Sequence, residues 1–124
     1  MKEVRIDREM RGSVDWLRLT GSLDMYSLPR LVALVQARFD QGHYCVVLDC
    51  GRLDYIGSAG LGAFIGFSTQ ARDHNGDFKL LNVPERIFKI ISLLGFTKVL
   101  HLYTTEQEAL ASFPPDEIRR HEVA

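Results

Sequence analysis

Near the start of the chain, apolar and polar residues alternate with a period of two, which predicts β-strands. Residues 4–6 fit a short strand and residues 14–19 fit a longer one. The segment between them, Arg11-Gly12-Ser13, is typical of a turn. The two strands are therefore expected to pair as a hairpin.

Farther along, the apolar period changes to that of helices, and three helices are predicted at residues 28–39, 58–72 and 84–94. Ser27 is a plausible N-cap for the first of these and Ser58 for the second. The third helix is expected to bury one apolar face, made of Ile87, Ile90, Ile91 and Leu94.

Continuous or alternating apolar runs at residues 45–48, 78–81 and 99–103 predict three more strands. A capping-box sequence, Thr105-Glu106-Gln107-Glu108, opens a last helix that is expected to reach Ser112. The order is then β-β-α-β-α-β-α-β-α, which predicts an α/β domain with one mixed, mostly parallel sheet and helices mainly on one face. Residues 14–19 are expected to lie beside residues 45–49. We assign residues 1–113 to the domain and 114–124 to a polar tail.

Composition narrows the class of protein. The 124 residues are 46% hydrophobic, so one globular domain is expected. The net charge is -1, and without an excess of basic residues the sequence does not indicate nucleic-acid binding. No apolar run approaches the roughly 20 residues that span a bilayer, and the N-terminus does not resemble a signal peptide. Cys45 and Cys50 are too far apart along a strand to form a disulfide. These features predict a soluble, cytoplasmic protein without membrane insertion.

The most unusual segment is residues 53–62, which follows a predicted buried strand and opens a helix. Three glycines and Ala59 leave little side chain over the first helical turn, so another backbone could approach closely. A helix N-terminus also tolerates a phosphate, here on Ser58. From spacing alone, we favour the purely structural interpretation, in which Ser58 is a cap and the small residues allow close packing.

Enzymatic interpretations of this segment fail on specific residues. A dinucleotide fingerprint needs an acidic residue where the next strand ends, but Asn82 stands there. The lysine of a P-loop and the spacing of a nucleophile elbow are both missing. No histidine is well placed to act as a base for Ser58: the four are His43, His74, His101 and His121. We therefore predict no catalytic residue, metal or cofactor, and no enzymatic activity.

Two aspartates flank the segment in the predicted fold. Asp24 follows the second strand and Asp54 precedes Ser58, so both are expected near one edge of the sheet. Hydrogen bonding within a turn is the favoured role for Asp54. For Asp24, turn bonding and partner binding remain equally open.

Several segments together form an ordered pattern along nearly the whole chain, from about residue 4 to residue 113. They are Gly21-Ser22-Leu23-Asp24, Val46-Val47-Leu48-Asp49, Tyr55-Ile56-Gly57-Ser58-Ala59-Gly60-Leu61-Gly62, Leu80-Leu81-Asn82-Val83, Leu94-Gly95-Phe96 and Glu108-Ala109-Leu110. By this pattern the chain resembles the STAS domains of the bacterial anti-sigma factor antagonists.

The resemblance implies a function for Ser58. In that family the serine at this position is phosphorylated by an anti-sigma factor with a GHKL-type serine kinase fold, and phosphorylation releases the pair until a serine phosphatase resets it. ATP and magnesium belong to the kinase, so no cofactor is implied for this chain. The implied partner-binding residues are Asp24, Ile56, Gly57, Ser58, Ala59, Gly60, Leu61 and Gly62.

One residue departs from the family pattern, because Gly57 stands where an aspartate is usual. This departure puts efficient phosphorylation in doubt and leaves an alternative open, a docking module in a signalling assembly or beside a transport ATPase that never switches. Edge strands permit a monomer or a weak dimer.

Overall fold

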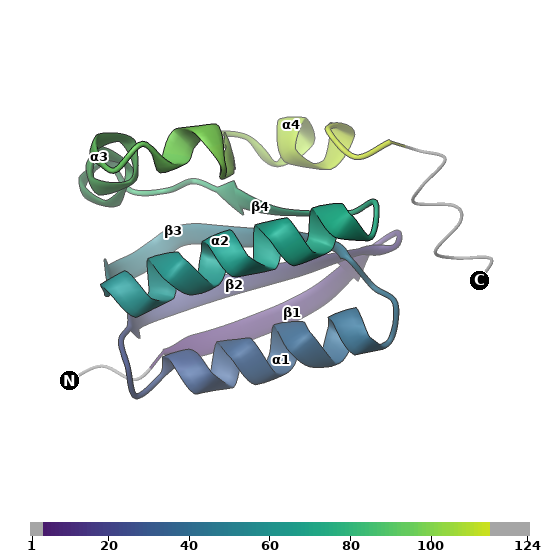
Figure 1. The fold of residues 1–124 in the computed structure, drawn as a ribbon, viewed down its shortest axis with the longest axis horizontal. Helices are drawn as coiled ribbons and strands as arrows, with labels where there is room; N and C mark the ends of the chain where they lie inside the picture. Colours follow the sequence, from purple (N-terminus) through teal and green to yellow (C-terminus); the bar gives the residue numbers. More distant parts are fainter. Residues whose placement is uncertain (1–3, 115–124) are drawn as a thin grey trace.

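The computed structural model describes residues 4–114, which form a five-stranded sheet with helices on both faces (Figure 1). The strands are β1 (Arg5–Arg11), β2 (Val14–Leu23), β3 (Cys45–Ile56), β4 (Asp77–Leu81) and β5 (His101–Tyr103). They lie in the order β1-β2-β3-β4-β5. Strands β1 and β2 pair antiparallel, and every other neighbouring pair is parallel. The predicted hairpin, the mixed sheet and the pairing of β2 with β3 are confirmed.

The helices follow the strands in the predicted order. They are α1 (Leu28–Asp40), α2 (Ser58–Asp73), α3 (Glu85–Leu93) and α4 (Glu106–Ala111), with a short 3-10 helix, η1 (Phe96–Lys98), before β5. Thr105 caps α4, because its Oγ1 accepts from the backbone N–H of Glu108 at 3.2 Å; the hydroxyl also donates to Glu108 Oε1 at 2.8 Å.

Two apolar cores lie on opposite faces of the sheet. The larger one packs buried residues of α1, α2 and α3 against the sheet, among them Leu31, Phe64 and Ile91. The smaller one places Ala109 and Phe113 against residues of β2, β3 and β4: Val14, Trp16, Cys45, Val47 and Leu81. Helices therefore cover mainly one face, as predicted, and α4 with Phe113 covers part of the other.

Strand β3 is much longer than predicted. It continues beyond Leu48 to Ile56, but only Leu53 and Ile56 of its last six residues are buried. The exposed residues between them break the apolar pattern from which a strand is recognised. Asp54 thus lies within β3 rather than in the turn that we expected.

The predicted apolar face of α3 is only half buried. Ile87 and Ile91 enter the large core, whereas Ile90 is 43% exposed and Leu94 is 54% exposed. The adjacent Leu93 is 88% exposed. Only one line of α3 residues therefore reaches the core, and the prediction that Ile90 and Leu94 would be buried is wrong.

The outer strand β1 is rich in charge. Five of its seven residues are charged, and most of β1 is exposed. Arg8 on β1 and Arg38 on α1 both donate through Nε–H to Oδ1 of the buried Asp15 carboxylate. Each Nε–Oδ1 distance is 2.9 Å. This carboxylate links the edge strand to the first helix.

Candidate functional site

The candidate site lies where β3 runs into α2 at the carboxyl end of the strands. Ser58 is exposed and is the first residue of α2. Gly57, not Ser58, occupies the N-cap position, with extended backbone at φ -84° and ψ 171°. The predicted cap role of Ser58 is therefore wrong, because β3 extends to Ile56 and leaves a single residue before the helix.

The first turn of α2 is open. It contains no acidic residue, and no side chain of residues 4–114 forms a capping hydrogen bond there. The backbone N–H groups at a helix start lack partners within the helix and form the positive end of its dipole. A hydroxyl placed there is thus accessible and lies in a setting that favours negative charge.

Three of the predicted partner-binding residues lie under this surface. Ile56 is 7% exposed, Leu61 is 4% exposed and Gly60 is buried. A Cβ on Gly60 would come within 2.7 Å of Ile56 Cγ1. Gly60 therefore lets the first turn of α2 pack closely on the end of β3, and these residues shape the site from below.

By contrast, Ala59 and Gly62 are exposed together with Ser58. A Cβ on Gly62 would meet nothing within 4 Å, and the same is true of Gly66 one turn later. Glycine inside a helix costs about 1 kcal/mol relative to alanine. Close packing within the chain does not require these two glycines, which keep the exposed side of α2 flat beside Ser58.

The turn that carries Asp24 lies against this helix start. Leu23 pairs with Ile56 in the sheet, and its carbonyl accepts a hydrogen bond from the backbone N–H of Gly57 at 3.1 Å. Asp24 Oδ1 accepts from the backbone N–H groups of Tyr26 at 2.9 Å and Ser27 at 3.0 Å. These bonds, first that of Ser27, lower the pKa of Asp24 below its ordinary value.

Ser27 serves this turn and does not cap α1 through its side chain. Its hydroxyl donates to the carbonyl of Ser22 at 2.9 Å and accepts from the backbone N–H of Asp24 at 3.0 Å. The turn is therefore rigidly bonded, and Asp24 is ionised at neutral pH.

Around the helix start lie large exposed side chains that were not predicted as site residues from the sequence. Met25 is 71% exposed, Tyr26 is 77% exposed and Tyr55 is 54% exposed. Tyr55 pairs with Ser22 in the sheet, so these side chains come from adjoining segments. Exposed aromatic and methionine side chains are enriched at protein interfaces. Their turn and strand-end positions gave no apolar periodicity that could have revealed them.

The described histidines have other contacts. His74 stacks on Tyr44 at 4.1 Å between ring centroids, just before β3 begins and thus at the opposite end of the strand from Ser58. His101 Nδ1 lies 2.6 Å from Asp77 Oδ2. His121 lies outside the described residues. Within residues 4–114, no group of histidine, cysteine or acidic side chains could hold a metal ion.

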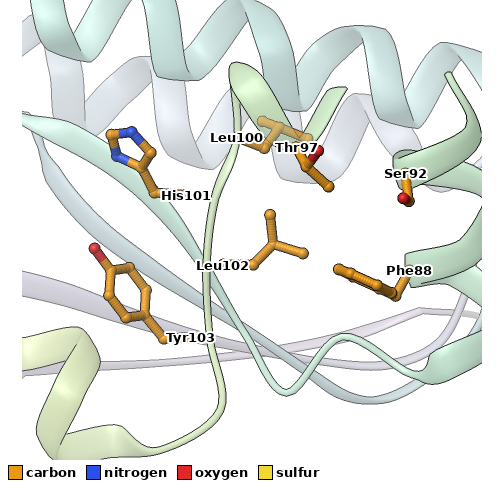
Figure 2. A pocket seen from close by; sticks show the side chains of 7 residues that line it. All are labelled: Phe88, Ser92, Thr97, Leu100, His101, Leu102 and Tyr103. Carbon is orange, nitrogen blue, oxygen red and sulfur yellow. The ribbon is translucent and has the colours of Figure 1, made fainter. Parts of the chain in front are cut away.

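A hollow of about 470 Å³ lies elsewhere, along β5 (Figure 2). Phe88 and Leu102 reach it from one side of the strand, and His101 and Tyr103 project on the other. None of residues 56–62 lines it. The serine and this hollow are therefore separate features.

The fold and the site together define a small α/β domain that presents a serine at an exposed helix start. The family model of the STAS domain matches residues 5–109, and the chain belongs to this family. The chain is 32% identical over 95 residues to BtrV of Bordetella bronchiseptica, which carries the name of an anti-sigma factor antagonist, covering 77% of this chain and 82% of that one. It is 26% identical to the anti-sigma-B factor antagonist of Staphylococcus epidermidis over 69% of this chain and 80% of that one.

Solved structures show the same fold. An anti-sigma factor antagonist from Mycobacterium paratuberculosis matches with a TM-score of 0.80 and 22% identity, over 90% of this chain and 94% of that one. The anti-sigma factor antagonist SpoIIAA matches in its unphosphorylated form with a TM-score of 0.71 and 24% identity, over 93% of this chain and 98% of that one. The phosphorylated form of SpoIIAA from Bacillus matches with a TM-score of 0.70 and 24% identity, over 86% of this chain and 97% of that one.

None of the helices within residues 4–114 is both long enough and apolar enough to cross a bilayer.

Proposed function

We propose that this chain is a cytoplasmic anti-sigma factor antagonist that has no enzymatic activity of its own. It binds an anti-sigma factor with a GHKL-type serine kinase fold. This partner phosphorylates Ser58, and the complex then dissociates. A serine phosphatase restores binding. The observation that carries the proposal is the exposure of Ser58 as the first residue of an open helix start.

The geometry supports a change in binding with little change in folding. A phosphate on Ser58 adds about -1.5 to -2 charges at neutral pH. The open first turn of α2 tolerates this charge, because the helix dipole favours it and no acidic residue of that turn repels it. An interface fitted to a neutral hydroxyl would instead bury a charge without partners, which is costly.

The relatives give independent support. Two of the curated relatives carry the name of anti-sigma factor antagonists. SpoIIAA, which shares the fold, has been solved both with and without phosphate. A fold of this kind therefore accommodates phosphorylation in at least one relative.

The test uses the full chain and the kinase-fold anti-sigma factor of the same genome, with ATP and magnesium. Mass spectrometry should find one phosphate, on Ser58, and Ser58→Ala should abolish it. Ser58→Asp should weaken binding by about 1–3 kcal/mol and leave thermal unfolding nearly unchanged. Phosphate on another residue, or full affinity of Ser58→Asp, contradicts the switch.

Gly57 favours a second candidate, a docking module of the same family that binds through this surface without being switched. Its Cβ position lies 3.5 Å from the hydroxyl oxygen of Tyr55, an ordinary contact, and its backbone is open to any residue. Gly57→Asp should therefore fold, and it should speed phosphorylation if an aspartate assists that step. If neither the parent nor Gly57→Asp is phosphorylated while both bind, the docking function replaces the switch.

A further inference from the structure

Helix α3 carries an unusual concentration of exposed apolar side chains. Ile90 and Leu93 are 43% and 88% exposed, and Leu94, which directly follows the helix as its C-cap, is 54% exposed. We call these three residues the α3 strip. Isolated surface leucines need no explanation, but neighbouring ones on one short helix mark a contact surface. The strip contributes little to the large core, which α3 enters through Ile87 and Ile91.

The strip lies on the side of α3 that faces the candidate site. Arg86 Nη2 donates to the backbone carbonyl of Asp54, four residues before Ser58. Arg86, Ile90 and Leu93 are spaced by four and three residues, so they share one side of the helix. Figure 1 shows α3 and the first turn of α2 at the same end of the molecule.

The opposite flank of α3 has different surroundings. Phe88 and Ser92, one turn apart, face the hollow along β5 (Figure 2). The buried pair Ile87 and Ile91 separates this flank from the strip. The strip therefore lies on the side of α3 that Arg86 joins to β3, and none of its residues lines the hollow.

The position of the strip favours one of two possible occupants, the partner proposed to bind at Ser58 rather than a second copy of this chain. A stable interface buries roughly 800 Å² on each partner. Three partly exposed side chains supply only a fraction of that area. The strip therefore needs neighbouring contact surface, and Arg86 joins this side of α3 to the segment that leads through the exposed Tyr55 to Ser58, where the proposed partner binds.

We infer that the α3 strip is an apolar anchor for the same partner that binds at Ser58, and that its contribution is independent of phosphorylation. This inference rests on the proposed function. The strip has no charge, and burial of apolar surface depends on area rather than on a neighbouring charge. The partner is accordingly expected to place apolar side chains opposite α3, beside the part of its surface that contacts Ser58.

The experiment is a double-mutant cycle with the kinase-fold anti-sigma factor of the same genome, held in ADP so that no phosphate is transferred. The variants are Leu93→Gln, Ser58→Asp and both together, compared with the parent by calorimetry. Leu110→Gln is the matched control, because Leu110 is also an exposed helical leucine but lies on α4 at the other face of the sheet. Thermal melts verify that every variant is folded.

Leu93→Gln should weaken binding about tenfold, and by the same factor in the Ser58→Asp background. Leu110→Gln should bind like the parent. Parental affinity of Leu93→Gln overturns the anchor, even if Ser58→Asp still weakens binding and the proposed switch stands. A loss with Leu93→Gln but none with Ser58→Asp supports the anchor and overturns the switch.

Two further results would overturn the inference. One is disappearance of the Leu93→Gln effect in the Ser58→Asp background, which would make the strip and Ser58 a single coupled contact. The other is a dimer of the free chain, detected by sedimentation, that Leu93→Gln dissociates. In that case the strip would serve a second copy.

Discussion

Two glycines of α2, Gly60 and Gly62, have different steric surroundings. Gly60 lies against Ile56 and Leu23, where a Cβ would be 2.7 Å from Ile56 Cγ1 and 3.4 Å from Leu23 Cδ2. Gly62, two residues later, has open space around it. The sequence shows both as glycines in one motif, and only their neighbours in the fold distinguish them.

This difference can be tested with two alanine substitutions. Gly60→Ala should lower the free energy of unfolding by about 1–2 kcal/mol, because overpacking outweighs the gain in helix propensity. Gly62→Ala should raise it by about 0.5–1 kcal/mol, since only the propensity changes. Urea denaturation measures both. Equal effects of the two substitutions would contradict the packing role assigned to Gly60.

Asp24 predicts a dependence of stability on pH. Its pKa is lowered in the fold from an ordinary value of 3.8, chiefly by the hydrogen bond from the backbone of Ser27. A lowered pKa stabilises the fold while the carboxylate is ionised, so this contribution is complete above pH 3.8 and is lost as the pH falls through the lower folded value.

An NMR titration of the parent should therefore find the Asp24 carboxyl titrating below 3.8. Asp24→Ala should be less stable than the parent near neutral pH, and the two should converge in stronger acid. Asp7, an exposed aspartate on β1, offers a comparison in Asp7→Ala. A normal titration of Asp24 would show that the turn does not depend on its ionised form.

At the scale of elements, α4 is held in place by contacts of the two residues that follow it, Ser112 and Phe113. Phe113 is 3% exposed and lies in the small core with Trp16. The ammonium of Lys79, itself buried, lies 4.5 Å from the centroid of the Phe113 ring and 3.5 Å from the carbonyl of Ser112. A six-residue helix is marginal alone, so these contacts fix its position.

Phe113→Ala should accordingly lower the free energy of unfolding by about 3 kcal/mol. It should also shift the fluorescence of Trp16 to longer wavelength, because α4 no longer covers the indole. Leu110→Ala, on the same helix but 37% exposed, should cost far less and leave the emission unchanged. If the emission of both variants stays that of the parent, Phe113 does not hold α4 over Trp16.

The elements also show which features of the fold can be predicted from apolar periodicity alone. Every predicted strand and helix exists, and β2, β3, β4 and the first three helices bury apolar residues from which they were predicted. The predictions of where β3 ends and of which face α3 buries were wrong for one physical reason. Periodicity records which residues are apolar, whereas burial depends on what packs above them, and the second half of β3 and the flanks of α3 are only partly covered.

At the scale of the whole molecule, the mixed sheet and the pairing of β2 with β3 were predicted from the alternation of strands and helices, and both are observed. The positions of β4 and β5 beyond β3 come from the structure. The candidate site was predictable in its location, at the end of β3. Its composition was not, since Ile56, Gly60 and Leu61 lie beneath it while Met25, Tyr26 and Tyr55 surround it.

The two outer strands of the sheet have a consequence for the protein at high concentration. Edge strands can pair between molecules and seed aggregates, but β1 is mostly charged and β5 has only three residues. Both features oppose growth of the sheet from one molecule into the next. The free protein can then reach a high concentration without being consumed by self-assembly.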